Sequence, residues 1–397
     1  MFDASGNRYI DFLAGSGALN YGHNHPRLKE AIVRYLAHNG VLHSLDLHTE
    51  AKAEFIRRFV GVILKPRGMD YRLQFTGPTG TNAVEAALKL ARKVTGRSRV
   101  VAFTGAFHGV SMGSLALTAS PEHRSAAGLP LNGTIRMPYD GFLGLNDELT
   151  YIERMLTAPG SGEEPPAAFV VETVQGEGLA CASAEWLNGV QRLARSMGSL
   201  LIVDDIFAGC GRTGTFFSFE RYGIEPEIVC LSKSIGGIGL PLALVLIRPD
   251  CDCWNPGEHN GTFRGNNLAL VAAAEALAFW EEPQFLSGVQ DVIRVLDSEL
   301  TGIENEFYEF GVRAVGRGSL RGIEVEQHEV AASVQAAAFH RGLMFERCGA
   351  RNSVIKLLPP LNIPAALLRE AMDILAESLR ASLEPAPVSK LYETVQS

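Results

Sequence analysis

Residues 200–237 read LLIVDDIFAGCGRTGTFFSFERYGIEPEIVCLSKSIGG, and this stretch decides the fold. It holds two continuous apolar runs, at 200–203 and 228–231, which are typical of strands buried on both faces of a parallel sheet. Similar runs lie at 100–103, 168–171 and 242–247, and helical patterns lie at 82–94 and 184–197. This alternation predicts an α/β domain whose mostly parallel sheet lies between helices.

The chain is long enough to need two domains. Its 397 residues exceed the size that one core usually serves. After a helical stretch at 267–280 the pattern changes: residues 321–326 alternate like a half-exposed strand, and 365–379 have helical spacing. We therefore expect a smaller α+β domain formed by residues 1–44 and 283–397. Residues 45–282 then form the large domain.

Composition excludes several classes of partner. The net charge is −8 and no basic run occurs, which argues against nucleic acid. No apolar run reaches the roughly 18 residues of a membrane span, and the first residues lack the features of a signal peptide. Six cysteines lie scattered at spacings that do not fit a zinc site. We expect a cytoplasmic protein with reduced thiols and no metal.

Lys233 is the first candidate for chemistry. It follows the apolar run at 228–231 and lies between serines, just before two glycines. An amine held in a partly desolvated pocket has a lowered pKa and condenses with a carbonyl group. The alternative is a lysine at a strand end whose amine reaches water. Lys233 alone does not decide between the two.

Asp204 ends the apolar run at 200–203, so it lies at the carboxyl end of a strand, where α/β sheets bind ligands. A buried carboxylate needs a partner. The protonated ring nitrogen of pyridoxal 5′-phosphate (PLP) is such a partner, and an amine such as that of Lys233 suits its aldehyde. The alternative is a helix cap or turn residue.

Residues 76–81, TGPTGT, lead directly into the helical stretch at 82–94. Hydroxyls and free N–H groups at a helix N-terminus form an anion site, and the spacing fits neither a dinucleotide fingerprint nor a Walker loop. Within the helix, Glu85 and Lys89 are interpreted as a solvent-exposed i,i+4 pair. Phe107 follows a predicted strand, and its ring is suited either to stacking on a planar cofactor or to the core.

Taken in the order in which they occur along the chain, these features resemble the class III, or ornithine-type, PLP-dependent aminotransferases of fold type I. Residues 172–178, ETVQGEG, resemble the family's E-P-x-Q-G-E-G run. Residues 204–206 and 209–214 resemble its D-E-V stretch and G-x-G-R-T-G tail, and Lys233 follows Asp204 at the family's spacing. Residues 261–266, GTFRGN, resemble the segment that reaches the phosphate of the partner subunit.

The resemblance implies a role for each matching residue. Lys233 binds PLP covalently and moves the proton, and Asp204 keeps the pyridine ring protonated. The resemblance also implies a homodimer or larger oligomer with shared sites, acting on a small-molecule amino donor and an aldehyde or keto acid. The remaining cofactor-binding positions are Thr79, Gly80, Thr81, Phe107, His108, Glu172, Ile206 and, from a second subunit, Thr262. The substrate positions are Glu177 and Lys356.

Within the family, residues 18–26, 74–82 and 256–267 resemble the diaminobutyrate aminotransferases. This implies transfer from L-glutamate to L-aspartate 4-semialdehyde. The chain also departs from the family pattern. Phe207 stands where a Gln usually contacts the cofactor's phenolic oxygen, Lys356 stands where many members have Arg, and the family's usual N-terminal segment has no counterpart here.

Two other interpretations remain open at this point. Fold and cofactor motifs do not by themselves distinguish an aminotransferase from an aminomutase or decarboxylase on the same fold, because the site decides the chemistry. A PLP-binding protein with impaired catalysis is the other, because of Phe207 and the absent N-terminal segment.

Overall fold

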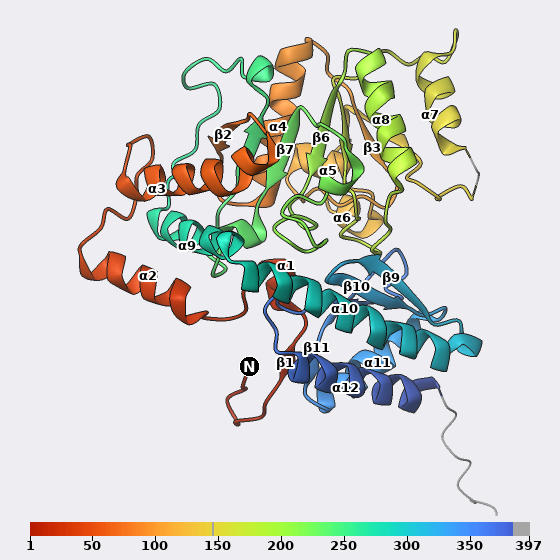
Figure 1. The fold of residues 1–397 in the computed structure, drawn as a ribbon. Coiled ribbons are helices and arrows are strands. Elements are labelled where there is room, and N and C mark those ends of the chain that lie inside the picture. Colours follow the sequence, from red (N-terminus) through yellow and green to blue (C-terminus); the bar gives the residue numbers. More distant parts are fainter. Residues whose placement is uncertain (145–146, 384–397) are drawn as a thin grey trace, which may run out of the picture.

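The computed structural model describes residues 1–144 and 147–383, and these form two units (Figure 1). The larger is built on a seven-stranded sheet and the smaller on a four-stranded sheet. Of the C-terminal part predicted at 283–397, residues 384–397 lie outside the described residues.

The large sheet contains all five predicted strands. Its order is β2 (Arg72–Phe75), β8 (Leu244–Ile247), β7 (Ile228–Leu231), β6 (Leu200–Asp204), β5 (Ala168–Val171), β3 (Val100–Phe103) and β4 (Thr134–Met137). The pairs from β7 to β4 are parallel, whereas β8 is antiparallel to both of its neighbours. The sheet is therefore mostly parallel, as predicted.

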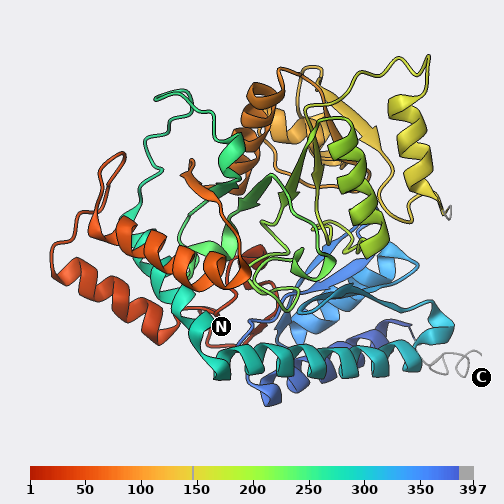
Figure 2. The same ribbon diagram turned by 45° about the horizontal axis from the view of Figure 1, so that its top comes forward.

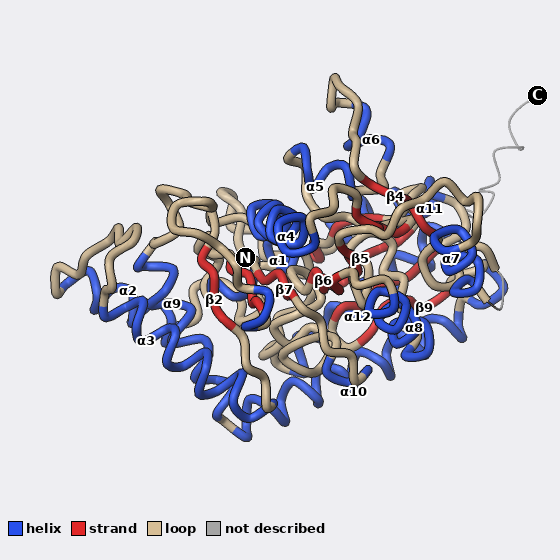
Figure 3. Tube along the Cα trace, turned by 90° about the horizontal axis from the view of Figure 1, so that it is seen from above, coloured by secondary structure: helices blue, strands red, loops and turns tan. Residues whose placement is uncertain are grey.

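The central strands are apolar throughout because both faces of the sheet are covered. In β3, Val100 and Ala102 pack with α4 (Gly80–Thr95), and Val101 and Phe103 pack with α8 (Ala184–Ser196). Successive side chains of a strand point to opposite faces, so each face needs its own apolar set. Figure 3 shows the sheet between these two helices.

The parallel strands place their carboxyl ends at one edge of the sheet. The turns that follow β3, β5, β6 and β7 carry residues 107–109, 172–178, 204–207 and 232–237. Segments separated by more than a hundred residues therefore meet at this edge, where such sheets bind ligands.

The smaller unit packs helices against an antiparallel sheet. The sheet order is β12 (Glu346–Cys348), β13 (Val354–Leu357), β10 (Leu320–Glu324) and β9 (Arg313–Arg317). Its core joins β13, β10 and β9 to α10 (Pro283–Glu306), α11 (His328–His340) and α12 (Ala365–Leu383). The predicted strand at 321–326 and helix at 365–379 are both present.

The N-terminal segment contacts both units. Strand β1 (Ile10–Asp11) pairs in parallel with β11 (Leu343–Met344) of the smaller unit. Helix α2 (Pro26–Ala37) instead packs on α9 (Asn267–Ala278) of the larger unit (Figures 1 and 2). Within residues 1–44, the strand thus joins the smaller unit and α2 the larger; the boundary at 44/45 stays a prediction.

The remaining helices lie around this framework. They are α1 (Ala14–Gly17), α3 (Glu50–Arg58), α5 (Met112–Leu117), α6 (Pro121–Ser125) and α7 (Glu148–Thr157). Shorter helical turns span Phe59–Leu64, Lys65–Arg67, Glu220–Tyr222, Lys233–Gly236, Pro249–Cys251, Phe279–Glu281 and Tyr308–Phe310. Across the described ranges, no helix combines the length and apolar character needed to cross a membrane.

Candidate active site

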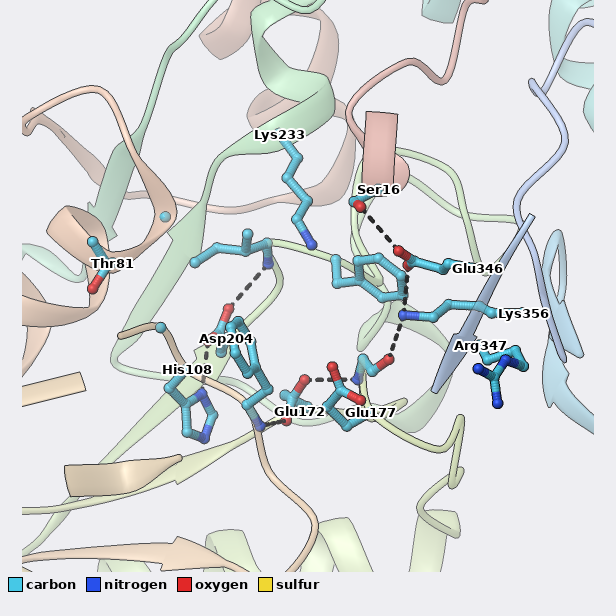
Figure 4. Close-up of a pocket in the computed structure, with 16 residues that line it drawn as sticks. Ser16, Thr81, His108, Glu172, Glu177, Asp204, Lys233, Glu346, Arg347 and Lys356 are labelled. Atoms are coloured by element: carbon cyan, nitrogen blue, oxygen red, sulfur yellow. Dashed lines mark hydrogen bonds and ion pairs between the residues drawn. The ribbon is translucent and has the colours of Figure 1, made fainter. Parts of the chain in front are cut away.

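A cavity of about 360 Å³ lies at the carboxyl edge of the large sheet, and β12 and β13 of the smaller unit close its far side (Figure 4). Ten of the twelve predicted site residues line it: Gly80, Thr81, Phe107, His108, Glu172, Glu177, Asp204, Ile206, Lys233 and Lys356. Ser16, Phe207, Glu346 and Arg347 also line it. The fold therefore brings most of the predicted residues together.

Lys233 begins the short turn after β7, and its amine points into the cavity (Figure 4). Its φ of +51° lies in the left-handed region, a strained conformation for a residue with a side chain. The hydroxyls of Ser232 and Ser234 hold the turn by donating to the carbonyls of Leu242 and Gly17.

The amine of Lys233 has the properties of a nucleophile. Burial, and then the positive charge of Lys356, lower its pKa to about 8. Among the residues described, none makes a hydrogen bond or ion pair with Nζ. The neutral form, which attack on a carbonyl requires, is therefore more populated near neutral pH than in an ordinary lysine.

Asp204, the last residue of β6, is buried and contacts His108. Its Oδ2 lies 2.7 Å from Nδ1 of His108, and its Oδ1 accepts a hydrogen bond from the N–H of Ile206. Burial by itself lowers the pKa of His108, but the hydrogen bond and charge of Asp204 outweigh it and raise that pKa. The imidazole thus supplies this buried carboxylate with a hydrogen-bond partner.

Glu172 follows β5 and organises the turns around it. Its two oxygens accept hydrogen bonds from the N–H groups of Phe107 and Gly176. Burial raises the pKa of Glu172 to about 7; the charge of His108 opposes this rise and that of Asp204 adds to it. Glu172 therefore fixes the backbone of Phe107, the residue predicted to stack on the cofactor ring.

Gly80 and Thr81 open α4 at the opposite side of the cavity. A Cβ at Gly80 would lie 3.1 Å from two side-chain carbons of Ile206, so the backbone of α4 approaches Ile206 closely at this position. The Thr81 hydroxyl lies 2.5 Å from the hydroxyls of both Ser111 and Ser114. Sequence reasoning missed these two serines, which follow Phe107 within one short turn.

The interpretation of Glu85 as half of a solvent-exposed pair was wrong. Its Oε1 accepts hydrogen bonds from Gly113 N, Ser114 N and the Ser111 hydroxyl, so it caps the N-terminus of α5. Lys89 instead donates to the carbonyl of Glu258. Tertiary contact with α5 overrides the i,i+4 spacing, because free N–H groups at a helix start attract a carboxylate.

Two predicted phosphate residues lie outside the cavity lining. Thr79 is exposed and caps α4, with its hydroxyl donating to Oδ1 of Asn82. Thr262 is exposed on the loop before α9, as a residue that serves a second subunit would be. The roles of both stay predictions.

Lys356 extends from β13, and its amine points toward the centre of the cavity (Figure 4). It pairs with Oε1 of Glu346 at 2.9 Å and donates to the carbonyl of Gly176. Glu346 in turn accepts from the Ser16 hydroxyl. Glu177 also lines the cavity, but the carboxylate that pairs with Lys356 is that of Glu346, which lies directly across the strand pair.

Phe207 lies between the two lysines. Its ring centroid is 3.9 Å from Nζ of Lys233 and 4.9 Å from Nζ of Lys356. The electron-rich face of an aromatic ring attracts an ammonium group. The ring therefore offers a contact to both amines at the position where the family usually has an amide.

Comparison with known proteins identifies the family. The model described as Aminotransferase class-III matches residues 1–379. The chain belongs to the class III aminotransferases. It is 51% identical to "Diaminobutyrate--2-oxoglutarate transaminase" of Oceanobacillus iheyensis, over 97% of the chain and 90% of that protein. It is 51% identical to the protein of that name from Vibrio cholerae, over 96% and 92%.

A solved structure confirms the predicted fold class. The ornithine aminotransferase of Toxoplasma gondii superposes with a TM-score of 0.82 at 27% identity, covering 96% of this chain and 88% of that one. The transaminase activity implied by the resemblance is likewise confirmed by the family match and the relatives.

The site fits the PLP of class III aminotransferases. It offers the amine of Lys233, which has no hydrogen bond or ion pair among the described residues, a buried carboxylate at Asp204 that keeps free lone pairs, and the N-terminus of α4 at Gly80 and Thr81. The amine suits the aldehyde of the cofactor, the carboxylate suits its protonated ring nitrogen, and the helix N-terminus suits its phosphate.

Proposed function

We propose that this chain transfers the amino group of L-glutamate to L-aspartate 4-semialdehyde, giving L-2,4-diaminobutyrate and 2-oxoglutarate. One observation carries the proposal: the amines of Lys233 and Lys356 face a single cavity, separated by the ring of Phe207. One amine serves as the reacting group and the other binds a substrate carboxylate. The two diaminobutyrate transaminases that share half of this sequence support the choice of substrates.

PLP, bound covalently at Lys233, supplies an electron sink for the carbon that carries the amino group. Asp204 would hold the ring nitrogen of this cofactor and favour its protonated form, while His108 holds the carboxylate in place. Phe107 and Ile206 would enclose the ring, and Gly80 and Thr81 with the N-terminus of α4 would hold the phosphate. Glu172 fixes the turn that carries Phe107.

Lys233 then moves a proton. Its amine would act as the base that takes the proton from the substrate carbon bearing the amino group, and then as the acid that gives this proton up. An amine with a pKa of about 8 is suited to act as base and then as acid near neutral pH.

The functional unit of the proposal is a homodimer in which Thr262 reaches the phosphate of the partner's site. The exposed apolar side chains Val41, Leu42, Leu47 and Phe263 come from two segments that meet at the His43–Asn266 bridge, and such patches mark interfaces. Dilution is expected to release PLP and activity together, and a stable monomer with tightly bound PLP would contradict the dimer.

A cytoplasmic location suits the six unpaired cysteines.

The half-reaction tests the proposal directly. L-Glutamate or L-2,4-diaminobutyrate should convert the aldehyde form of the cofactor to its amine form, and aspartate 4-semialdehyde or 2-oxoglutarate should reverse it, followed by absorption. Failure of 2-oxoglutarate to regenerate the aldehyde form would favour an aminomutase or decarboxylase. Bound PLP without any glutamate half-reaction would indicate a binding protein with impaired catalysis.

A further inference from the structure

The far end of the cavity presents a cation and an anion side by side. Lys356 and Glu346 are register partners on β13 and β12, with Nζ and Oε1 2.9 Å apart. The Lys356 side chain is only 6% exposed, whereas that of Glu346 is 29% exposed at the cavity wall. Glu346 is aimed by the Ser16 hydroxyl, which donates to its Oε2 over 3.1 Å (Figure 4).

Both groups keep capacity for a ligand. An ammonium group has three N–H donors, and Lys356 uses two of them, on Glu346 and on the Gly176 carbonyl. A carboxylate has about four acceptor sites, and Glu346 uses one on each oxygen, for Lys356 and Ser16. An adjacent cation and anion with free capacity complement a zwitterion, whereas a lone carboxylate needs only the cation.

We propose that Glu346 and Lys356 together bind the α-amino-acid head of a substrate whose terminal amine reacts at Lys233. Glu346 accepts hydrogen bonds from the α-ammonium group, and Lys356 donates to the α-carboxylate. The inference rests on the proposed function and names its specificity-determining residue. In L-2,4-diaminobutyrate the carboxylate lies three carbon–carbon bonds from the reacting carbon, as the far carboxylate of L-glutamate does. Only diaminobutyrate adds an ammonium group beside it.

The test compares three donors in the half-reaction: L-2,4-diaminobutyrate, 4-aminobutyrate, which lacks only the α-ammonium group, and L-glutamate. In Glu346→Gln the preference in kcat/KM for diaminobutyrate over 4-aminobutyrate should fall about 10- to 100-fold, the value of a lost charge-assisted hydrogen bond. The change should lie in KM rather than kcat. The preference for glutamate over 4-aminobutyrate should not fall.

Two further variants separate binding from structure. Ser16→Ala removes an exposed hydroxyl and should lower the same preference by about threefold to tenfold, because it only positions Glu346. Glu324→Gln is the matched control: Glu324 pairs with Arg313 across neighbouring strands of the same sheet and does not line the cavity. It should leave the preference unchanged.

A binding measurement does not depend on turnover. The cofactor-free chain should bind L-2-aminobutyrate more tightly than butyrate in calorimetric titrations, and Glu346→Gln should abolish the difference. Equal losses for all three donors, or an unchanged binding difference, would overturn the inference. If the wild-type enzyme turns over neither glutamate nor diaminobutyrate, the proposed function fails, and the binding difference still decides the role of Glu346.

Discussion

The two ends of the cavity hold hydrogen-bonded pairs of opposite character. At the cofactor end, His108 and Asp204 are 2.7 Å apart with side chains 0% and 4% exposed, and both belong to the larger unit, in the turn after β3 and at the end of β6. At the substrate end, Lys356 and Glu346 are 2.9 Å apart, but the carboxylate is 29% exposed and comes from the smaller unit. The His108–Asp204 pair is enclosed and keeps its partners, whereas the Lys356–Glu346 pair is accessible to a ligand.

Removing the reacting amine should have the largest effect. Lys233→Ala should lower the half-reaction rate by at least about 10³-fold, because it loses both the covalent attachment and the proton carrier. In the wild type, borohydride reduction should leave PLP attached to the peptide that contains residue 233, as mass spectrometry would show. Attachment to any other lysine would break the assignment of the cofactor end.

Asp204→Asn keeps the size of the side chain and removes its charge. We expect a rate loss on the order of 10³-fold, because a preorganised charge no longer stabilises the protonated ring. The loss should appear in kcat measured under saturating PLP. Turnover near that of the wild type would exclude Asp204 as the partner of the ring nitrogen. It would also show that the His108–Asp204 pair is not needed for catalysis.

Lys356→Ala tests the substrate end. The apparent KM for dicarboxylate donors should rise about 10- to 100-fold, because a charged donor is lost, while the KM for a simple monoamine changes much less. Steady-state or half-reaction kinetics with both kinds of donor measure the split. Equal effects on the two kinds would remove Lys356 from the substrate pocket.

The pH dependence of cofactor attachment sharpens the comparison further. The Lys233 amine has a lowered pKa of about 8 and attacks only when neutral. The rate at which the cofactor-free chain takes up PLP should therefore rise about tenfold per pH unit below pH 8 and level off above it. Stopped-flow absorption measures this profile. A midpoint near the ordinary lysine pKa would show that the amine is not desolvated.

The smallest effect is expected at Phe207, where the two ends meet. Phe207→Gln restores a hydrogen bond to the phenolic oxygen and removes the ring between the two lysines. We expect PLP affinity or the half-reaction rate to rise by up to about tenfold. No change, or a loss, measured by PLP titration would mean that the ring's contacts with Lys233 and Lys356 already replace the amide.

The cofactor end could be predicted because its residues follow from local pattern. Lys233 and Asp204 each follow an apolar run, and apolar runs of this length become central strands whose carboxyl ends share one edge. Predicting this edge did not require knowing which strands pair with each other or in which register. The sequence by itself therefore determined the sheet, its ligand-binding edge and the positions of Lys233 and Asp204 at that edge.

The tertiary structure alone decided the substrate end. Glu346 meets Lys356 only through the register of β12 and β13, and a shift by one residue would turn its side chain to the other face. Ser16 reaches Glu346 from the opposite end of the chain, and Glu85 caps a helix that begins 27 residues after it. Such contacts depend on how separate elements pack, and no spacing along the chain encodes the identity of the neighbour.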